Sequence, residues 1–414
     1  MSRCKNSAIK KHKQSKEQPA DVLVEKFPLR LTQDQVLLAR SLQMEAAKVW
    51  NAVCNIHRTV YRRYRYWLQE GAIKTMLKGK YGVHSQTAQV VVETYFECCE
   101  RTRKLREQGY TDWRYPYRKK KFFTVTWKKL GIKHTGRIIK LSSGRGRKTL
   151  IITLPERLSS AKIHQAQLVW HRNQYWLHVT VEKPALLKVQ GNVSAAIDPG
   201  EVHAVTITDG NEALVISGRL LRSLHRLKNK KLRSFQRAIS KTRRGSRKRR
   251  RLLDRKYRFL NWFNRRKEHL LHTISANTVR WCLARNIKTV FIGNPVGVRE
   301  KECGRKHNQR ISQWAFGKLR SLLEYKLKRH GIKLVAVDER GTSGTCPVCG
   351  KYTKQSGRIY RCSSSCGYKG AHRDVIGASG ILDKSVNGGF TRGRKLPQKV
   401  DYLRPRVVAP KKVA

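Results

Sequence analysis

The chain has 414 residues, of which 91 are lysine or arginine and 27 are aspartate or glutamate, giving a formal net charge of +64. Self-repulsion on this scale destabilises a compact chain that lacks a polyanionic partner, so nucleic-acid phosphates are the expected counter-charge. An apolar content of 39% excludes a wholly disordered tail protein. The sequence lacks an apolar stretch of about 18 residues, which argues against a membrane-spanning helix. A protein that only coats nucleic acid and an enzyme that acts on it both stay open.

The N-terminal half reads as a β module with a helical insertion. Residues 1–20 are basic and lack the apolar stretch of a signal peptide, which favours a disordered tail. A strand is predicted over 22–31, and Thr32 with Gln35 has the spacing of a capping box that opens a helix. Further patterns predict a helix over 85–107 and strands over 122–127, 148–155, 167–172 and 174–182, with a hairpin turn at 171–174. The β module would comprise 21–32 and 109–190, with the insertion at 33–108.

Basic and aromatic residues alternate after the first predicted helix. Such a mixture suits a surface that grips phosphates and stacks on bases, although plain amphipathic helices with solvated faces fit equally well. The candidate contacts in this half are Arg62, Arg63, Tyr64, Arg65, Lys119, Lys120 and Lys121.

The C-terminal half begins with a buried run, 193–197, that ends at Asp198. The patterns that follow predict strands over 203–208 and 212–216, a basic helical region over 220–285, a strand over 289–292, a helix over 312–330, a strand over 333–337 and a short helix opened by Asp374. This β-β-β-α-β-α-β order, with acids at strand ends, is typical of an RNase H-like fold over 191–341 and 372–383. The Gly- and Lys/Arg-rich segment 384–414 is expected to be a flexible basic tail.

One basic run stands out within the long helical region. Eight of the eleven residues from Lys241 to Arg251 are lysine or arginine. A solvated helix face is the plain explanation, but the density favours a nucleic-acid contact. The candidates are Arg243, Arg244, Arg247, Lys248, Arg249, Arg250 and Arg251.

Four of the ten cysteines form a CxxC…CxxxC pattern within residues 342–371. Cys346 and Cys349 are separated from Cys362 and Cys366 by twelve residues. Four thiolates at this spacing suit tetrahedral zinc, and disulfides are the alternative. Because all four ligands belong to the protein, the site should be structural and hold one Zn²⁺.

Two acidic segments carry a family resemblance. Phosphodiester cleavage by two metal ions needs carboxylates brought together from distant stretches of sequence. Ala195-Ala196-Ile197-Asp198-Pro199-Gly200 resembles the first RuvC motif of the TnpB family, although such a segment alone is more often a turn. Ala371-His372-Arg373-Asp374 resembles the third RuvC motif, except that Ile376 stands where the family usually has asparagine. The segment 342–350 also resembles the family's approach to its zinc finger, whose usual second CxxC is here longer by one residue.

The second RuvC motif is incomplete. The family usually has a glutamate directly after the fourth strand, where this chain has Gly293. Either the enzyme is dead or another carboxylate serves, and the fifth strand ends in Asp338 and Glu339. In an RNase H-like sheet the first, fourth and fifth strands are adjacent and parallel, so a carboxylate at the end of the fifth strand could reach ions held at the first. Asp338 and Glu339 point to opposite faces, so only one of them can serve directly. Some family members and their Fanzor relatives look rearranged, with the glutamate on the later strand, so by resemblance Glu339 is the candidate. A solvent-exposed loop carboxylate is the alternative, and Glu300, Glu302 and Glu324 are less well placed.

The resemblance implies a multidomain α+β protein with a wedge-like β-barrel, a helical recognition insertion and a RuvC-like domain interrupted by a zinc-ribbon-like module. It implies a transposon-encoded, RNA-guided endonuclease that cuts double-stranded DNA beside a short target-adjacent motif. Asp198, Glu339 and Asp374 would bind two catalytic Mg²⁺, and a monomer would bind one guide RNA. The location would be cytoplasmic in a prokaryote and nuclear in a eukaryote. The alternatives are a nuclease-dead, RNA-guided repressor on the same scaffold and a compact type V CRISPR effector.

Overall fold

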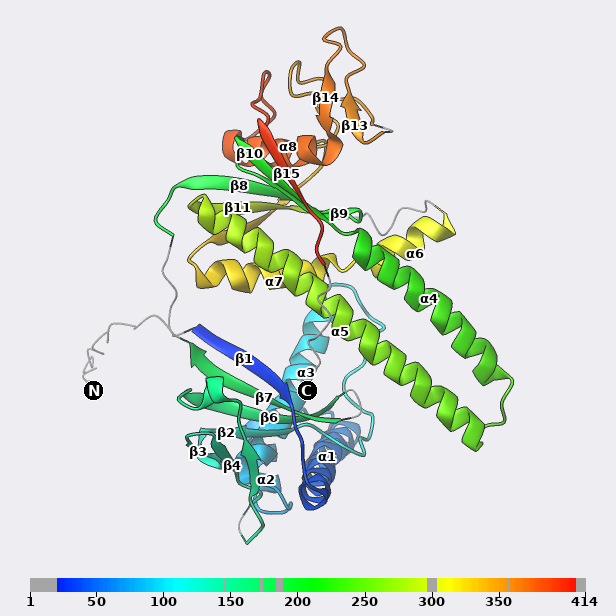
Figure 1. Cartoon of the computed structure of the whole chain (residues 1–414). Helices are drawn as coiled ribbons and strands as arrows, with labels where there is room; N and C mark the ends of the chain where they lie inside the picture. Colours follow the sequence, from blue (N-terminus) through cyan, green and yellow to red (C-terminus); the bar gives the residue numbers. More distant parts are fainter. Residues whose placement is uncertain are drawn as a thin grey trace, which may run out of the picture. The chain divides into compact units, whose positions relative to one another are not determined.

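A computed structural model describes residues 21–144, 146–171, 174–183, 189–295, 304–355 and 357–406. The chain divides into two compact units, residues 1–184 and 185–414, and both contain helices and sheets (Figure 1). The expected N-terminal tail, 1–20, lies outside the described residues. Within the described ranges, no helix combines the length and apolar character needed to cross a membrane.

The strands of the N-terminal unit form two antiparallel sheets, with the orders β1-β7-β6-β2 and β3-β4-β5. Their bounds are β1 Asp21–Pro28, β2 Val125–Lys128, β3 Ile132–Thr135, β4 Ile138–Leu141, β5 Leu150–Thr153, β6 Ile163–His171 and β7 Gln174–Lys183. His171 pairs with Gln174 at the predicted hairpin, whose residues 172 and 173 lie outside the described ranges. β3 and β4 are too short for their alternation to predict them. The two sheets are hydrogen-bonded separately, so closure of a barrel stays a prediction.

Three helices lie between β1 and β2 in the sequence. They are α1 Gln33–Tyr64, α2 Glu70–Leu77 and α3 Ser85–Glu107. The predicted capping box is present, because the Thr32 side chain accepts from the Gln35 amide and the Gln35 side chain accepts from the Thr32 amide. Trp50 of α1 and Val91 of α3 are buried in the same core as Trp127 of β2. The helical segment therefore shares its core with the strands and has no separate one.

The C-terminal unit contains a six-stranded sheet with the order β12-β11-β8-β9-β10-β15. The bounds are β8 Val193–Asp198, β9 His203–Thr208, β10 Glu212–Ser217, β11 Ile287–Asn294, β12 Lys333–Asp338 and β15 Lys399–Leu403. β8, β9 and β10 form an antiparallel meander, whereas β11 runs parallel to both β8 and β12. The predicted adjacency of the first, fourth and fifth strands of this unit is confirmed.

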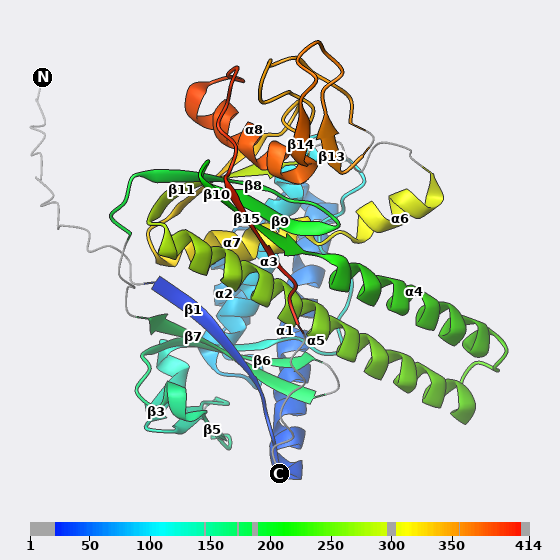
Figure 2. The ribbon, with the colours of Figure 1, turned by 45° about the horizontal axis from the view of Figure 1, so that its top comes forward.

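Helices cover both faces of this sheet (Figure 2). The helices of this unit are α4 Arg219–Ser240, α5 Arg247–Ala284, α6 Arg305–Gln313, α7 Phe316–Arg329 and α8 Arg373–Asn387. Leu271 of α5 and Leu323 of α7 pack in one core with Ile197 of β8. α8 covers the other face, where Val375 packs against Ala213 and Val215 of β10. Since successive strand residues alternate between faces, Asp198 lies on the face opposite Ile197, beneath α8.

Two predicted helices are interrupted. The region 220–285 contains two helices, because the chain turns at Gly245, whose φ of +82° suits glycine. The segment 312–330 is not one helix either. Trp314 has an extended conformation, with φ −64° and ψ 121°, and ends α6 before α7 begins. The first break falls in the basic run 241–251, which contains Gly245 and no apolar residue, whereas apolar residues continue through the second break at Trp314, Ala315 and Phe316. Periodicity therefore conceals only the second break.

The expected flexible tail from residue 384 is wrong for the described part of that segment. Residues 384–387 complete α8, and β15 pairs in parallel with β10 from Glu212↔Lys399 to Ile216↔Leu403. Asp383 accepts hydrogen bonds from the Thr391 amide and hydroxyl, at 2.7 and 2.8 Å. The high charge hides a short alternating strand, which adds an edge to the sheet. Residues 407–414 lie outside the described ranges.

Candidate metal centre

The structure brings three predicted carboxylates to one edge of the six-stranded sheet. Asp198 ends β8, Glu339 follows β12 directly, and Asp374 lies in the first turn of α8. Burial and the charges of Asp374 and Glu339 raise the pKa of Asp198 well above its ordinary value. Burial and the charge of Asp338 raise the pKa of Glu339 to about 6. Asp198 therefore ionises against the charges of the other two carboxylates, as expected of a cation site without its cation.

Two glycines make room for these carboxylates. A Cβ built on Gly293 would lie 2.6 Å from Glu339 Oε2, and a Cβ built on Gly377 would lie 2.6 Å from Asp198 Oδ2. Gly293 is next to Ile292, which pairs with Ile197 of β8. The Glu339 carboxylate thus occupies the space that the first side-chain atom at position 293 would need.

Glu339 and its neighbour Asp338 have different surroundings. Oε2 of Glu339 is buried and has no hydrogen-bond partner. The side chain of Asp338 is 55% exposed and pairs with Lys384 at 3.3 Å. A buried carboxylate oxygen without a partner is costly, which makes Glu339 the better candidate ligand. Glu324 is exposed on α7, and Glu300 and Glu302 lie outside the described residues.

We expect Gly293→Ala to reduce metal-dependent nuclease activity while preserving the fold. The new Cβ would displace the Glu339 carboxylate and also approach Ile381 Cδ1 at 3.0 Å, an overpacking that typically costs about 1–3 kcal/mol. Thermal unfolding and cleavage assays of the purified protein measure the two effects. Gly71→Ala is the matched control, because a Cβ there meets nothing within 4 Å. Unchanged cleavage by Gly293→Ala would contradict the close approach.

Asp374 has two histidine partners: His372, which lies in the quoted motif, and His203, which the sequence patterns do not indicate. Its Oδ2 lies 2.7 Å from Nδ1 of His203, and its backbone amide donates to Nδ1 of His372 at 3.2 Å. Burial works to raise the pKa of Asp374, but the hydrogen bond from His203 and nearby positive charge outweigh it and hold the pKa below its ordinary value. Asp374 is therefore the carboxylate of this centre that stays ionised although it is buried.

Among the described residues, two sets of side chains have ligand atoms all within 4.8 Å of one another. One is the four cysteines, and the other is His203, His372 and Asp374. Asp198, Glu339 and Asp374 together do not reach this spacing. Two metal ions about 3.5–4 Å apart need a wider set of ligands than one ion does. The oxygen donors, the unpaired Oε2 and the space beside both glycines fit divalent cations that prefer oxygen.

The four cysteines converge as their spacing predicts. Sγ of Cys346 lies 3.7 Å from Sγ of Cys366, and Sγ of Cys349 lies 3.7 Å from Sγ of Cys362. A regular tetrahedron with Zn–S bonds of about 2.3 Å has edges of about 3.8 Å. Disulfide sulfurs lie about 2.05 Å apart, so these pairs are not bonded to each other. The geometry fits one zinc ion.

The additional residue of the second cysteine pair makes room for a serine in the cluster. The Ser364 hydroxyl lies 2.8 Å from Sγ of Cys362 and 3.1 Å from Sγ of Cys349. Its hydrogen bond is the main cause that lowers the pKa of Cys349 to about 6, and it also lowers the pKa of Cys362. Since zinc binds thiolates, Ser364 prepares two of the ligands.

The candidate nucleic-acid residues of the N-terminal unit differ in whether their charges already contact other residues. Arg63 lies over the Tyr64 ring, and the Tyr64 side chain is 64% exposed. Arg62 and Arg65 are exposed, as are Lys119 and Lys121. Lys120 is exposed as well, but its ammonium packs 3.6 Å from the centre of the Trp50 ring, so its charge already has a partner within the fold.

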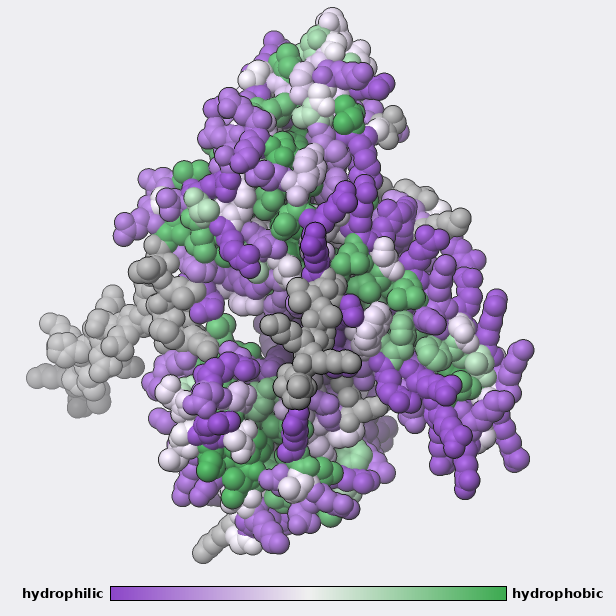
Figure 3. All heavy atoms as spheres, in the orientation of Figure 1, coloured by the Kyte–Doolittle hydropathy of each residue, from purple (hydrophilic) through white to green (hydrophobic). Residues whose placement is uncertain are grey.

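The candidates in the C-terminal unit gather at the far end of the α4–α5 hairpin. Arg243 and Arg244 lie in the turn, and the others occupy the first turns of α5; all except Arg249 are exposed. Arg249 donates to the carbonyl oxygens of Ile239, in the last turn of α4, and of Thr242, just after that helix. Hydrophilic side chains project from this hairpin (Figure 3). The first turn of α5 has no acid, although the helix dipole favours acids there.

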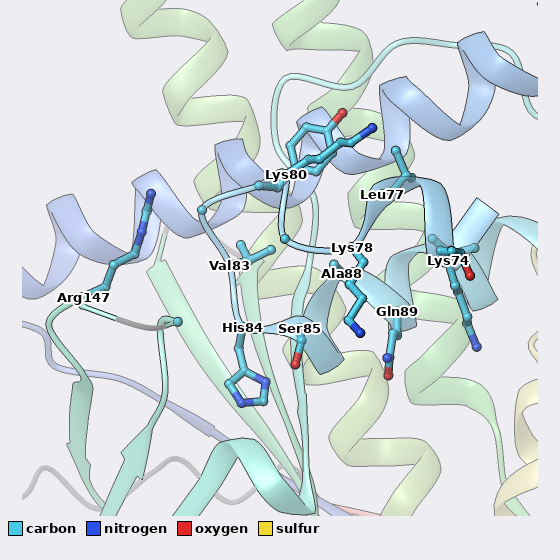
Figure 4. A pocket seen from close by; sticks show the side chains of 16 residues that line it. Lys74, Leu77, Lys78, Lys80, Val83, His84, Ser85, Ala88, Gln89 and Arg147 are labelled. Carbon is cyan, nitrogen blue, oxygen red and sulfur yellow. The ribbon is translucent and has the colours of Figure 1, made fainter. Parts of the chain in front are cut away.

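A basic cavity in the N-terminal unit adds candidates that the sequence patterns do not single out. It has a volume of about 780 Å³, and no described residue that lines it is acidic. Lys78, Lys80 and His84 line it from the loop between α2 and α3, and Arg147 lines it from the loop between β4 and β5 (Figure 4). These cations are too sparse in the sequence to form a charge run like the one that predicts the α4–α5 contacts.

Two family descriptions match the chain. A probable transposase family matches residues 177–299, and a Cas12f1-like TNB domain matches residues 316–381. A TnpB-like protein of Methanocaldococcus jannaschii is 30% identical over 131 residues, which cover 31% of this chain and 46% of that protein. A TnpB-like protein of Acidianus two-tailed virus is 26% identical over 206 residues, covering 49% and 44%. The matches thus span less than half the length of these curated relatives.

Two solved structures share the fold. A Cas12f1 from a complex with single-guide RNA and target DNA has a TM-score of 0.60 at 15% identity, covering 85% of this chain and 83% of that one. CasPhi-2 (Cas12j) bound to crRNA and phosphorothioate-DNA has a TM-score of 0.50 at 10% identity, covering 92% and 94%. At these identities the likeness concerns the fold alone.

Proposed function

The chain belongs to the TnpB family, and we propose that it is an RNA-guided endonuclease that cuts double-stranded DNA beside a short target-adjacent motif. The observation that carries the proposal is the buried, unpaired Oε2 of Glu339, together with the burial of Asp198 beside the charges of Asp374 and Glu339, which raises the pKa of Asp198. Carboxylates held against one another cost stability, so their arrangement is explained best by a cation that joins them.

In this proposal the RuvC-like nuclease comprises residues 191–341 and 372–383. Asp198, Glu339 and Asp374 hold two Mg²⁺, which when bound would activate a water and stabilise the leaving oxygen of the phosphodiester. Gly293 and Gly377 keep the space beside the carboxylates open. The parallel strands β8, β11 and β12 fix the distance between the backbones of Asp198 and Glu339. Residues 342–371 form the zinc module, with one structural Zn²⁺.

Guide RNA and target DNA supply the counter-charge. At the start of α5 a row of cations stands at the positive end of a helix dipole, which is unfavourable in the free protein. A phosphate backbone at this end would relieve the repulsion. Base pairing would read the target sequence, while the protein would hold the heteroduplex by its backbone. One chain per guide RNA is the proposed stoichiometry.

A second candidate is a nuclease-dead, RNA-guided repressor on the same scaffold, and Gly293 in place of the usual glutamate favours it. Cleavage of a guide-matched duplex in the presence of Mg²⁺ separates the two functions. Target binding with no cleavage at any Mg²⁺ concentration would favour the repressor. A compact type V CRISPR effector would share the chemistry and differ in the source of its guide.

We expect the purified chain to prefer its own guide RNA over random RNA of equal length at about 0.3 M salt. A protein that makes six to ten phosphate contacts loses about 10³–10⁵-fold in purely electrostatic affinity between 50 and 200 mM salt. Sequencing the copurified RNA identifies the guide, and filter binding over a salt series measures the preference. Equal affinities for both RNAs would make a protein that only coats nucleic acid the better explanation.

A further inference from the structure

Both the backbone and the side chain of Asp374 are held by histidines. His372 precedes α8 as its N-cap, and its Nδ1 accepts from the Asp374 amide at 3.2 Å. His203 opens β9, and its Nδ1 lies 2.7 Å from Asp374 Oδ2. The two imidazole rings meet edge to face, with centroids 4.8 Å apart. Asp374 is thus held from its own helix and from a neighbouring strand of the sheet.

The direction of the His203 hydrogen bond follows from the chemistry of its partner. An ionised carboxylate only accepts hydrogen bonds, so Nδ1 of His203 must carry the proton. Oδ2 of Asp374 therefore accepts the His203 proton with one of its lone pairs, and Oδ1 is the oxygen with more capacity left for a cation. The ion-pair contact of Oδ1 is with Arg373 Nε at 3.9 Å, which is too long for a hydrogen bond.

From this geometry we propose that His203 is a positioning residue for the metal centre. It fixes the Asp374 carboxylate in one orientation and leaves Oδ1 to bind the cation. The inference rests on the proposed nuclease function, because it gives Asp374 the role of a metal ligand. Partners of this kind orient metal ligands, and losing one typically costs about 10–100-fold in metal affinity or activity.

The side chain of His203 is only 10% exposed, and that of Asp374 is 18% exposed. Because solvent has little access to either side chain, losing the imidazole would leave Oδ2 of Asp374 without its 2.7 Å hydrogen bond. Asp374 would then be free to rotate about its side-chain torsions, and its charge would lose a partner. The loss should appear first as weaker cation binding, because the backbone of Asp374 remains held by His372.

The test compares three substitutions at His203 in the ribonucleoprotein with a matched DNA target. Asparagine carries its amide nitrogen where histidine carries Nδ1, so His203→Asn can keep the donor. Glutamine places its nitrogen one bond further out, and alanine has none. We expect His203→Ala and His203→Gln to raise the Mg²⁺ concentration for half-maximal cleavage about 10–100-fold, and His203→Asn to stay within a few-fold of wild type. His134→Ala, in the N-terminal unit, serves as the control.

Two measurements separate positioning from a merely structural role. Target binding should match wild type in all three variants, each should unfold cooperatively as a folded protein, and Mn²⁺ affinity measured by electron paramagnetic resonance should fall in those variants whose Mg²⁺ response falls. An unchanged Mg²⁺ dependence in His203→Ala, or equal losses in His203→Asn and His203→Gln, would overturn the proposal. If His203→Ala fails to fold, the asparagine and glutamine variants still decide it. If wild type does not cleave, the proposed nuclease fails, and Mn²⁺ binding alone tests His203.

Discussion

Glu339→Gln is expected to abolish Mg²⁺-dependent cleavage of a guide-matched target while leaving target binding intact. Glutamine keeps the size of the side chain and removes the charge that the cations require. The expected loss in rate is at least about 10²–10³-fold, the scale on which one preorganised electrostatic group acts. Asp198→Ala should have the same effect, because burial and neighbouring charge place both groups at one centre. Single-turnover cleavage and gel-shift assays of the same ribonucleoprotein measure the two quantities.

Asp338→Asn is the matched control for this prediction. Asp338 is adjacent in sequence, but its carboxylate is exposed and pairs with Lys384 at 3.3 Å. We expect the control to cleave at close to the wild-type rate. Full cleavage by Glu339→Gln, or loss of cleavage only in Asp338→Asn, would show that the carboxylate after β12 has been chosen wrongly.

Glu339→Gln should also stabilise the protein when no metal is present. The pKa of Glu339 is raised to about 6 in the folded chain, above the ordinary glutamate value near 4.3. A raised carboxyl pKa destabilises the fold where the group is ionised, and the effect vanishes below the unfolded pKa. Glu339→Gln should therefore raise the midpoint of thermal unfolding at pH 7 to 8 and leave it unchanged near pH 4. A lower midpoint at pH 7 would mean that Glu339 is a structural partner.

Restoring a glutamate at position 293 should not rescue Glu339→Gln. A Cβ at 293 would lie 3.3 Å from the Glu339 Cβ as well as 2.6 Å from Oε2, so both side chains compete for one space. If Glu339 serves as we propose, the fold keeps a carboxylate near the centre but supplies it from the end of β12 in place of β11. This exchange is visible in the sequence only as a missing glutamate at one strand end and an additional one at the next.

The sequence predicts those features that depend on local patterns. Asp198 and Glu339 follow short apolar strands, and the adjacency of parallel strands brings their ends together. The four cysteines have the spacing that zinc needs. Gly293 alone cannot distinguish a dead enzyme from a rearranged one, whereas the structure gives it a steric reason through the contact with Glu339.

Other features depend on contacts between distant residues and have no local signal. His203 and Asp374 are 171 positions apart, yet their side chains form a 2.7 Å hydrogen bond. β15 has only five residues in a highly charged segment, and it becomes recognisable once β10 is available to pair with it. Ile376, which departs from the family's usual asparagine, is fully buried with Cys346 and Tyr360. Its apolar side chain therefore has a packing role that the motif comparison misses.

The packing of Ile376 links the cysteine module to the candidate metal centre. Cys346, Tyr360 and Ile376 form one buried cluster, and Ile376 lies in α8 two residues after Asp374. β14, Lys369–His372, pairs with β13, Ile359–Arg361, within the module and leads directly into α8. Arg394 donates to the Thr345 carbonyl at 2.8 Å and fastens the C-terminal segment to the module. Loss of zinc should therefore disturb both the module and the start of α8.

Cys349→Ser is accordingly expected to lose the zinc, unfold the module and abolish cleavage. Structural zinc supplies on the order of 10 kcal/mol of folding free energy, more than such a module can replace by packing. Elemental analysis should give one zinc per wild-type chain and less than one in the variant. Limited proteolysis should then cut within residues 342–371. Cys98→Ser, outside the cluster, is the control and should keep its zinc.

Ser364→Ala tests the same site without removing a ligand. The loss of its hydroxyl should raise the pKa values of Cys349 and Cys362, so protons compete better with zinc. Zinc retention should then fall as the pH is lowered from 7 to 5, at higher pH in the variant than in wild type. An identical pH profile would show that Ser364 is a bystander. Carefully purified wild type that contains no zinc and still cleaves would show that the zinc module is not needed to position Asp374. The first turn of α8 would then be stable without it.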